Sequence, residues 1–163
     1  MFASGAGSLG WALAASIGAR QALDDTAPKS DAIVACVTGD GSYMFGMPSA
    51  SYWVSSRYKL PFLAVVLNNG GSFRVAQDLT MLGWNAPKFS ALGVHPTGFA
   101  SKSNLDELNI SLDPPADYGM IAEAAGAWSK TVKDMKELEC GLQEAVKIVQ
   151  GGRSAMLNVF VRD

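Results

Sequence analysis

The sequence predicts an α/β fold, with a doubly wound, mainly parallel sheet and helices on both faces. Two short apolar runs rich in β-branched residues, 32–37 and 62–67, flank a helical pattern over 48–57, which is the order of a βαβ unit. Both runs stop at clusters of glycine and polar residues, as buried parallel strands do. Strands and helices continue to alternate to the end of the chain, which favours a sheet covered by helices.

Capping signals and helical spacing predict the other elements. Asp134 with Glu137 three residues later resembles a capping box, and Gly151 is placed to end the helix that they begin. Asp117 is placed to cap a shorter helix. The expected elements are, in order, a helix from 9 to about 23, a strand at 32–37, a helix at 48–57, a strand at 62–67, a short helix within 117–127, a strand at 128–132, a helix from 134 to 151 and a strand at 155–161.

The composition is that of one globular domain. The chain has 163 residues, of which 48% are hydrophobic and 17% charged. A chain of this length buries about 68–70% of its unfolded surface without disulfides or metals. We therefore expect a single domain over 1–163, in which residues 84–116 form a long irregular insertion because they contain four prolines and no sustained period. Cys36 and Cys140 are expected to be buried free thiols.

Charge and hydropathy argue against two classes of partner. Thirteen Lys and Arg against 15 Asp and Glu give a formal net charge of −2 with no basic run, so the sequence offers no electrostatic source of affinity for nucleic acid. No apolar stretch reaches the roughly 18 residues of a membrane span, and the first residues lack the pattern of a signal peptide. We expect no nucleic acid or membrane partner and a cytoplasmic location, or an organelle if truncation has removed a transit peptide.

Two polar clusters mark the candidate functional site. The first apolar run ends in Gly39-Asp40-Gly41-Ser42, the second ends in Asn68-Asn69-Gly70-Gly71, and 26 residues separate Gly41 from Asn68. If the two strands are neighbours, about 4.8 Å apart, Asp40 and Asn69 emerge side by side at the edge where parallel sheets bind ligands. Carboxylate, amide and backbone oxygens are the ligands that Mg²⁺ or Ca²⁺ prefers. The N-terminus of a helix after Gly41 would favour phosphate oxygens.

Three segments, in this order, resemble the diphosphate-binding domain of the thiamine-diphosphate enzymes. In that family, Gly-Asp-Gly followed one crossover later by Asn-Asn is the cofactor signature, and the sequence carries both motifs. The opening Gly5-Ala6-Gly7-Ser8-Leu9-Gly10-Trp11 and the helical pattern after it resemble the family's glycine-rich segment. The similarity covers most of the chain and is greatest to the branch that holds acetolactate synthase, benzoylformate decarboxylase and pyruvate decarboxylase.

The resemblance implies a cofactor site with assigned residues. Thiamine diphosphate would be held through Mg²⁺, which would bind the Asp40 carboxylate, the Asn69 side-chain oxygen and the Gly71 backbone carbonyl. The apolar side chain that holds the cofactor bent would be Leu9, and the Gly7 carbonyl would accept from the cofactor's amino group. From the residues alone, Leu9 could equally be a core leucine of the first helical turn. The cofactor-binding residues implied are Gly7, Leu9, Gly39, Asp40, Gly41, Ser42, Asn69 and Gly71.

The resemblance also implies a missing partner. In the family, the glutamate that activates the cofactor belongs to a separate pyrimidine-binding domain, and the two domains pair across a dimer interface. No catalytic residue is therefore assigned in this sequence. The chain is expected to be an N-terminally truncated part of a 2-oxo-acid decarboxylase or carboligase, a homo-oligomer when full length, and incomplete without a pyrimidine-binding domain in cis or in trans.

Two alternatives stay open at this point. The chain could be a nucleotide-binding module of the same fold class, although no Gly-x-Gly-x-x-Gly follows the first strand and no P-loop lysine follows either glycine cluster. It could also be a non-catalytic remnant that keeps the fold and turns nothing over. A nucleotide module would bind ATP or NAD without thiamine diphosphate, whereas a remnant would bind none of the three at useful affinity.

Overall fold

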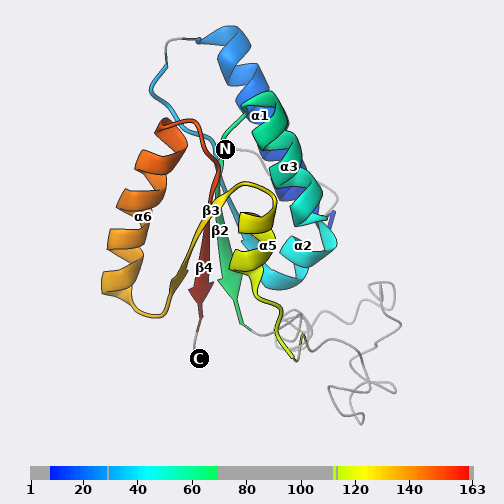
Figure 1. Cartoon of the computed structure of the whole chain (residues 1–163), viewed down its shortest axis with the longest axis vertical. Coiled ribbons are helices and arrows are strands. Elements are labelled where there is room, and N and C mark those ends of the chain that lie inside the picture. The colour runs from blue at the N-terminus through cyan, green and yellow to red at the C-terminus, as the bar shows by residue number, and fades with distance from the viewer. Residues whose placement is uncertain (1–7, 29, 70–111, 113, 162–163) are drawn as a thin grey trace, which may run out of the picture. The chain divides into compact units, whose positions relative to one another are not determined.

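The structure, a computed structural model, describes residues 8–28, 30–69, 112 and 114–161. All of the helices and strands named below belong to one compact unit, which takes in Met1–Asn68 and Asp117–Asp163. Residues 69–116 are assigned to a second unit, of which only 69, 112 and 114–116 are described. In the first unit a parallel sheet lies between two layers of helices (Figure 1).

Four strands form this sheet in the order β1-β2-β4-β3, and every neighbouring pair is parallel. The strands are β1 (Ala35–Gly39), β2 (Leu63–Asn68), β3 (Trp128–Val132) and β4 (Ala155–Phe160). The helices are α1 (Trp11–Thr26), α2 (Asp40–Phe45), α3 (Pro48–Tyr58), α5 (Tyr118–Ala124) and α6 (Met135–Gln150). The predicted α/β class with a parallel sheet is confirmed.

The two faces of the sheet bury alternate residues of β2. Leu63 and Val65 lie on the face that α6 covers, where they join a hydrophobic cluster with Ala145 and Val149 of that helix. Ala64 and Val66 are fully buried on the other face, which faces α1, α3 and α5 (Figure 1). Because both faces are buried, the strand carries an apolar run rather than an alternation, as the sequence indicated.

β1 differs from this pattern, and the prediction of a buried strand at 32–37 is wrong for one of its faces. The strand runs from Ala35 to Gly39 and, within the described part of the chain, forms one edge of the sheet. Because α6 packs over β2, β3 and β4, the α6 side of β1 is left open and Val37 is 65% exposed. Thr38, which points the other way, is buried.

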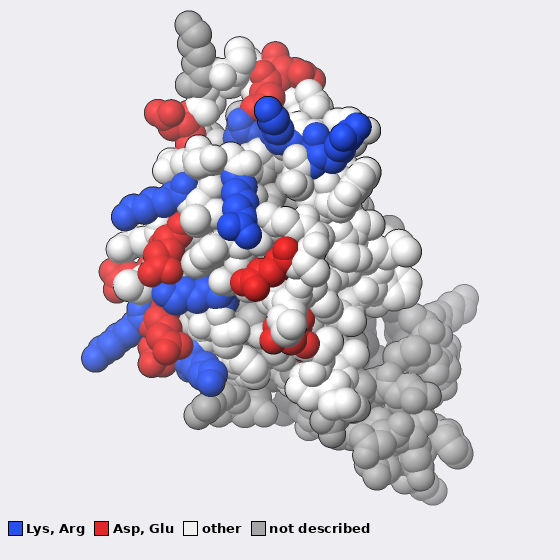
Figure 2. Space-filling view, in the orientation of Figure 1, with Lys and Arg blue, Asp and Glu red and all other residues white. Residues whose placement is uncertain are grey.

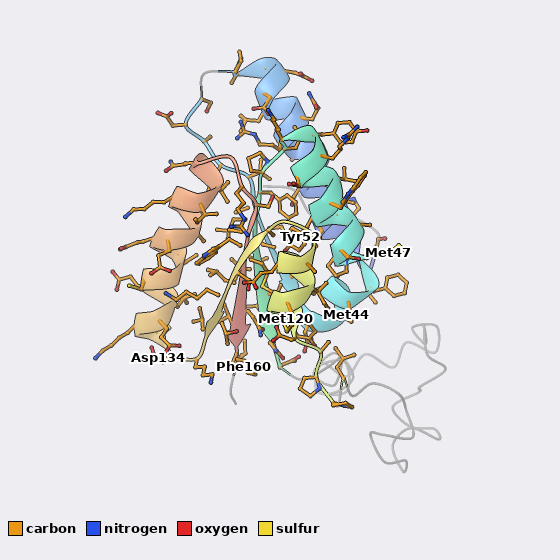
Figure 3. All side chains as sticks on the ribbon, viewed as in Figure 1. Met44, Met47, Tyr52, Met120, Asp134 and Phe160 are labelled. Atoms are coloured by element: carbon orange, nitrogen blue, oxygen red, sulfur yellow. The ribbon has the colours of Figure 1, made fainter. Side chains whose placement is uncertain are left out.

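The predicted caps of α5 and α6 are confirmed. The Asp134 carboxylate accepts from the backbone N–H groups of Lys136 and Glu137, both at 2.9 Å. The Asp117 carboxylate accepts from the Met120 N–H at 2.9 Å. Figure 3 shows Asp134 and Met120 at these helices.

Two expectations about helices and thiols are wrong. The helix expected after Gly41 begins two residues earlier than expected, at Asp40 rather than Ser42, and has only six residues. Cys140 is exposed and Cys36 is half-buried, so the pair are free thiols but not both buried. None of the helices that the structure describes is long and apolar enough to cross a membrane.

Candidate cofactor site

The carboxyl ends of β1 and β2 bring Asp40 and Asn68 to the same end of the sheet. In the parallel register Gly39 pairs with Leu67, so β1 and β2 end within one residue of each other along the sheet. Asp40 then begins α2 directly, and Asn68 is the last residue of β2. This is the edge at which open parallel sheets bind ligands.

Asp40 is buried at the point where β1 becomes α2. Its side chain is only 2% exposed, and one carboxylate oxygen accepts from the Gly41 N–H at 2.8 Å. Burying a carboxylate is unfavourable unless hydrogen bonds or a cation compensate for the lost water. A buried carboxylate at a ligand-binding edge is thus a position that a bound cation would stabilise.

Ser42 joins this cluster to the glycine-rich segment before α1. Its hydroxyl oxygen accepts from the Gly10 N–H at 2.9 Å, across 32 residues of sequence. A Cβ on Gly10 would lie 2.8 Å from the Gly46 Cα, so the two backbones touch and neither glycine leaves room for a side chain. Two of the three segments on which the resemblance depends are therefore adjacent in the structure.

Leu9 lies outside the core and outside the first helix. Gly10 adopts a left-handed backbone with φ 83°, so the helix does not extend back through it and α1 starts only at Trp11. Leu9 is consequently outside the helix and 51% exposed. The alternative in which Leu9 is a core leucine of the first helical turn is wrong.

The two asparagines that follow one another at the end of β2 have different surroundings. Asn68 is buried, and its side-chain amide donates to the Asn158 side-chain oxygen of β4 at 3.1 Å. Asn69 is exposed and belongs to the second unit. Asn68 therefore ties two strands together, and the assignment of Asn69 as a metal ligand stays a prediction of the resemblance.

Two of the implied site residues, Gly7 and Gly71, lie outside the described residues. The structure thus describes Leu9, Gly39, Asp40, Gly41, Ser42 and Asn69 and brings all but Asn69 together within one unit. Sequence reasoning missed Asn158. An asparagine in the middle of the apolar strand 155–160 was the available signal, because a buried amide requires a partner.

The donor chemistry around Asp40 fits a small hard cation. A Cβ built on Gly39 would meet no atom within 4 Å, so there is open space beside the carboxylate's strand end. The described residues hold no cluster of three or more His, Cys, Asp or Glu side chains that could form a metal centre. The ligand set that the resemblance implies needs only one carboxylate, with an amide and a backbone carbonyl, which is a Mg²⁺-type oxygen set.

The fold and this edge define a class of protein: a parallel α/β domain that binds its ligand beyond the carboxyl ends of its strands. Comparison with known proteins gives the family. The family model described as "Thiamine pyrophosphate enzyme, C-terminal TPP binding domain" matches residues 1–159. The chain belongs to this family; thiamine pyrophosphate is another name for thiamine diphosphate.

Curated relatives are acetolactate synthases. The chain is 31% identical over 157 residues to the acetolactate synthase isozyme 3 large subunit of Escherichia coli (strain K12). This match covers 96% of this chain and 22% of that protein. It is 31% identical over 159 residues to the acetolactate synthase large subunit of Buchnera aphidicola subsp. Schizaphis graminum (strain Sg), with 98% and 23% covered. The chain thus spans less than a quarter of the length of these relatives.

A solved structure has the same fold. The Rhodococcus jostii RHA1 thiamine diphosphate-dependent 4-hydroxybenzoylformate decarboxylase matches with a TM-score of 0.62 and 22% identity, over 96% of this chain and 23% of that chain. The parallel sheet and its helices are therefore those of a domain found in a larger enzyme.

Proposed function

We propose that this chain is the thiamine-diphosphate and Mg²⁺-binding domain of a 2-oxo-acid decarboxylase or carboligase, incomplete without a pyrimidine-binding domain. The observation that carries the proposal is the junction of Asp40, Ser42 and Gly10 at the carboxyl edge of the sheet. A buried carboxylate and the glycine-rich segment meet there, in a chain of the thiamine pyrophosphate enzyme family.

Each described site residue has a role in this proposal. Asp40 would hold the cation, with Asn69 and Gly71 as the further ligands that the resemblance implies. Gly39 and Gly41 allow the diphosphate to approach the backbone, and the Ser42 hydroxyl, which already accepts from Gly10, has its own proton to donate. Leu9 is exposed and apolar, so it can pack against the cofactor's rings. The cofactor, when bound, supplies the electron sink that decarboxylation of a 2-oxo acid requires.

The partner in the proposal is a pyrimidine-binding domain, and the surface beside the site supports it. No charged residue occurs from Gly41 to Ser56, and this stretch exposes Phe45, Met47 and Trp53 at 68%, 72% and 59%. Exposed aromatic and methionine side chains without charges are typical of the centre of a protein interface. In Figure 2 the charged side chains gather away from the α2 and α3 side of the molecule, and Figure 3 shows Met44 and Met47 on that side.

The proposal is tested by comparing ligands and then turnover. The chain, alone and mixed with the pyrimidine-binding domain of a relative, is titrated with thiamine diphosphate, ATP and NAD in the presence of Mg²⁺. We expect binding of thiamine diphosphate alone among the three, and release of CO₂ from a 2-oxo acid only in the mixture. Binding of ATP or NAD without thiamine diphosphate would identify a nucleotide module, and binding of none in the mixture would identify a remnant.

A further inference from the structure

Three fully buried tyrosines come from the helices on one face of the sheet: Tyr43 from α2, Tyr52 from α3 and Tyr118 from α5. Tyr43 and Tyr118 are each 0% exposed and Tyr52 is 1% exposed, and Figure 3 shows Tyr52 between α3 and the sheet. The Tyr43 hydroxyl donates to the Tyr118 backbone carbonyl at 3.1 Å. The hydroxyls of Tyr52 and Tyr118 are buried and, within the described part of the chain, meet no hydrogen-bond partner.

A buried hydroxyl without a partner requires an explanation. Most buried polar side-chain atoms are hydrogen-bonded, and a buried polar atom left without a hydrogen bond destabilises the fold. A phenylalanine would fill the same place in the core without this penalty. Within the part of the chain that the structure describes, Tyr118 and Tyr52 therefore each keep a buried hydroxyl that satisfies no hydrogen-bond partner at normal geometry.

The position of Tyr118 distinguishes it from Tyr52. Asp40 and Tyr43 are the two buried residues of α2 and lie about one turn apart, so they share the helix face that points into the molecule. On that face the Tyr43 ring meets the Tyr118 ring edge-on, with centroids 5.7 Å apart and planes at 66°. The buried side of α2 that carries Asp40 thus packs against the first residue of α5.

Electrostatics agrees with this placement. Burial, and after it the negative charge of Asp40, raises the pKa of the Tyr118 hydroxyl. Burial also raises the pKa of Tyr52 well above its usual value, but there the titratable neighbours are Tyr43 and Cys36 rather than a carboxylate. Whatever its neighbours, a tyrosine hydroxyl can donate a hydrogen bond to a carboxylate that comes within reach.

We propose that Tyr118 is a positioning residue for the cation site: its hydroxyl donates to the Asp40 carboxylate when that carboxylate binds the cation, and so fixes the orientation of the ligand. This inference rests on the proposed function, because it needs a cation at Asp40. Groups that orient a metal ligand in this way raise metal affinity, and their loss weakens it by about 10–100-fold.

The test uses Tyr118→Phe with Tyr52→Phe as the matched control, since each removes one buried hydroxyl that has no hydrogen-bond partner among the described residues. Mg²⁺ affinity in the presence of thiamine diphosphate is measured by calorimetry, together with the melting temperature of each cofactor-free chain, with the pyrimidine-binding domain present in the titrations. We expect both variants to melt at or above the temperature of the unaltered chain. Only Tyr118→Phe should lose about 10-fold or more in Mg²⁺ affinity.

The melting temperature and the Mg²⁺ affinity of Tyr118→Phe together distinguish a positioning role from a packing role. Positioning predicts lower Mg²⁺ affinity without a lower melting temperature. A purely structural Tyr118 would lower the melting temperature without changing cation affinity, and that result overturns the inference. Equal loss of affinity in both variants also overturns it, because Tyr52 is not placed beside Asp40. If the unaltered chain binds Mg²⁺ and Tyr118→Phe binds it equally, the inference alone fails; if the unaltered chain binds no cofactor, the proposed function fails and the inference with it.

Discussion

Asn68 and Asn69 are neighbours in the sequence, yet the strand assigns them different surroundings. Successive residues of a strand point to opposite sides, and β2 ends at Asn68 with its amide buried against Asn158. Asn69, one residue beyond the strand, is exposed. A motif of two identical side chains therefore contains one residue that is buried in the fold and one that is exposed, and it is the exposed one to which we assign the ligand role.

Alanine substitutions should separate these two roles. Asn68→Ala leaves the buried Asn158 amide without its partner, and we expect it to lower the free energy of unfolding by about 1–3 kcal/mol. Asn69→Ala, at an exposed position, should cost less stability than Asn68→Ala and should weaken Mg²⁺-dependent binding of thiamine diphosphate. Urea unfolding and calorimetry measure the two effects. A greater loss of stability in Asn69→Ala than in Asn68→Ala, or weaker cofactor binding in Asn68→Ala alone, would contradict this account of the motif.

The two thiols should differ in reactivity for a reason that the structure supplies. Burial raises the pKa of the Cys36 thiol, with Ser16 opposing part of the shift, so less thiolate is present at neutral pH. Cys140 is exposed on α6. We expect iodoacetamide to modify Cys140 first in the folded chain, as followed by mass spectrometry over time, and both thiols at similar rates in urea. Faster modification of Cys36 in the folded chain would contradict its described burial.

At the scale of elements, the sequence predicted the kinds and order of the helices and strands better than their surroundings. The strand at 128–132 matches the prediction because Gly126, in a left-handed conformation, and the Asp134 cap bound it closely. The helix expected from residue 9 begins at Trp11 because Gly10 is left-handed. Apolar periodicity extends across such a glycine, so the pattern alone could not place the start.

The contact between the backbones of Gly10 and Gly46 should be sensitive to a single methyl group. A Cβ on Gly46 would lie 2.7 Å from the Gly10 carbonyl oxygen, so we expect Gly46→Ala to cost about 1–3 kcal/mol of stability. Because that contact positions the segment that binds Ser42, cofactor affinity should fall as well. Thermal unfolding and calorimetry check the two effects.

Gly18 provides the matched control for this substitution on the neighbouring helix. It is exposed in α1, and a Cβ there would meet nothing within 4 Å. Gly18→Ala should therefore raise stability by about 0.5–1 kcal/mol through helix propensity. Equal effects of the two glycine substitutions would mean that the backbone contact has no energetic weight.

At the scale of the whole molecule, the sequence predicted the parallel sheet and the family but not which surfaces stay open. An apolar strand such as β1 looks the same in sequence whether helices cover one face or both, and Val37 shows that one face is open. Likewise, the pattern of apolar residues over 44–53 does not predict which of them are buried: Tyr52 is buried, whereas Trp53 is 59% exposed. Burial on a helix depends on which elements pack around it, and short-range patterns carry little of that information.

The exposed uncharged surface on α2 and α3 should govern association with the pyrimidine-binding domain. We expect Phe45→Glu to weaken that association by about 10-fold or more, as for a central interface residue, and to leave the melting temperature of the isolated chain nearly unchanged. Tyr58→Glu is the control, since Tyr58 is 65% exposed on α3 but lies beyond the uncharged stretch. Sedimentation of the mixture measures both, and equal weakening would contradict the assignment of the surface.

The central claim is that Asp40 holds the cation that binds thiamine diphosphate. The most direct measurement is calorimetric titration of the chain, in the presence of the pyrimidine-binding domain, with thiamine diphosphate at several Mg²⁺ concentrations, for the unaltered chain, Asp40→Asn and Asp31→Asn. Asp31 is an exposed carboxylate before the opposite end of β1. We predict Mg²⁺-dependent binding that Asp31→Asn preserves and that Asp40→Asn weakens by at least about 100-fold, beyond the loss of an outer-shell group. Binding that is independent of Mg²⁺, or equal in the two variants, would contradict the claim.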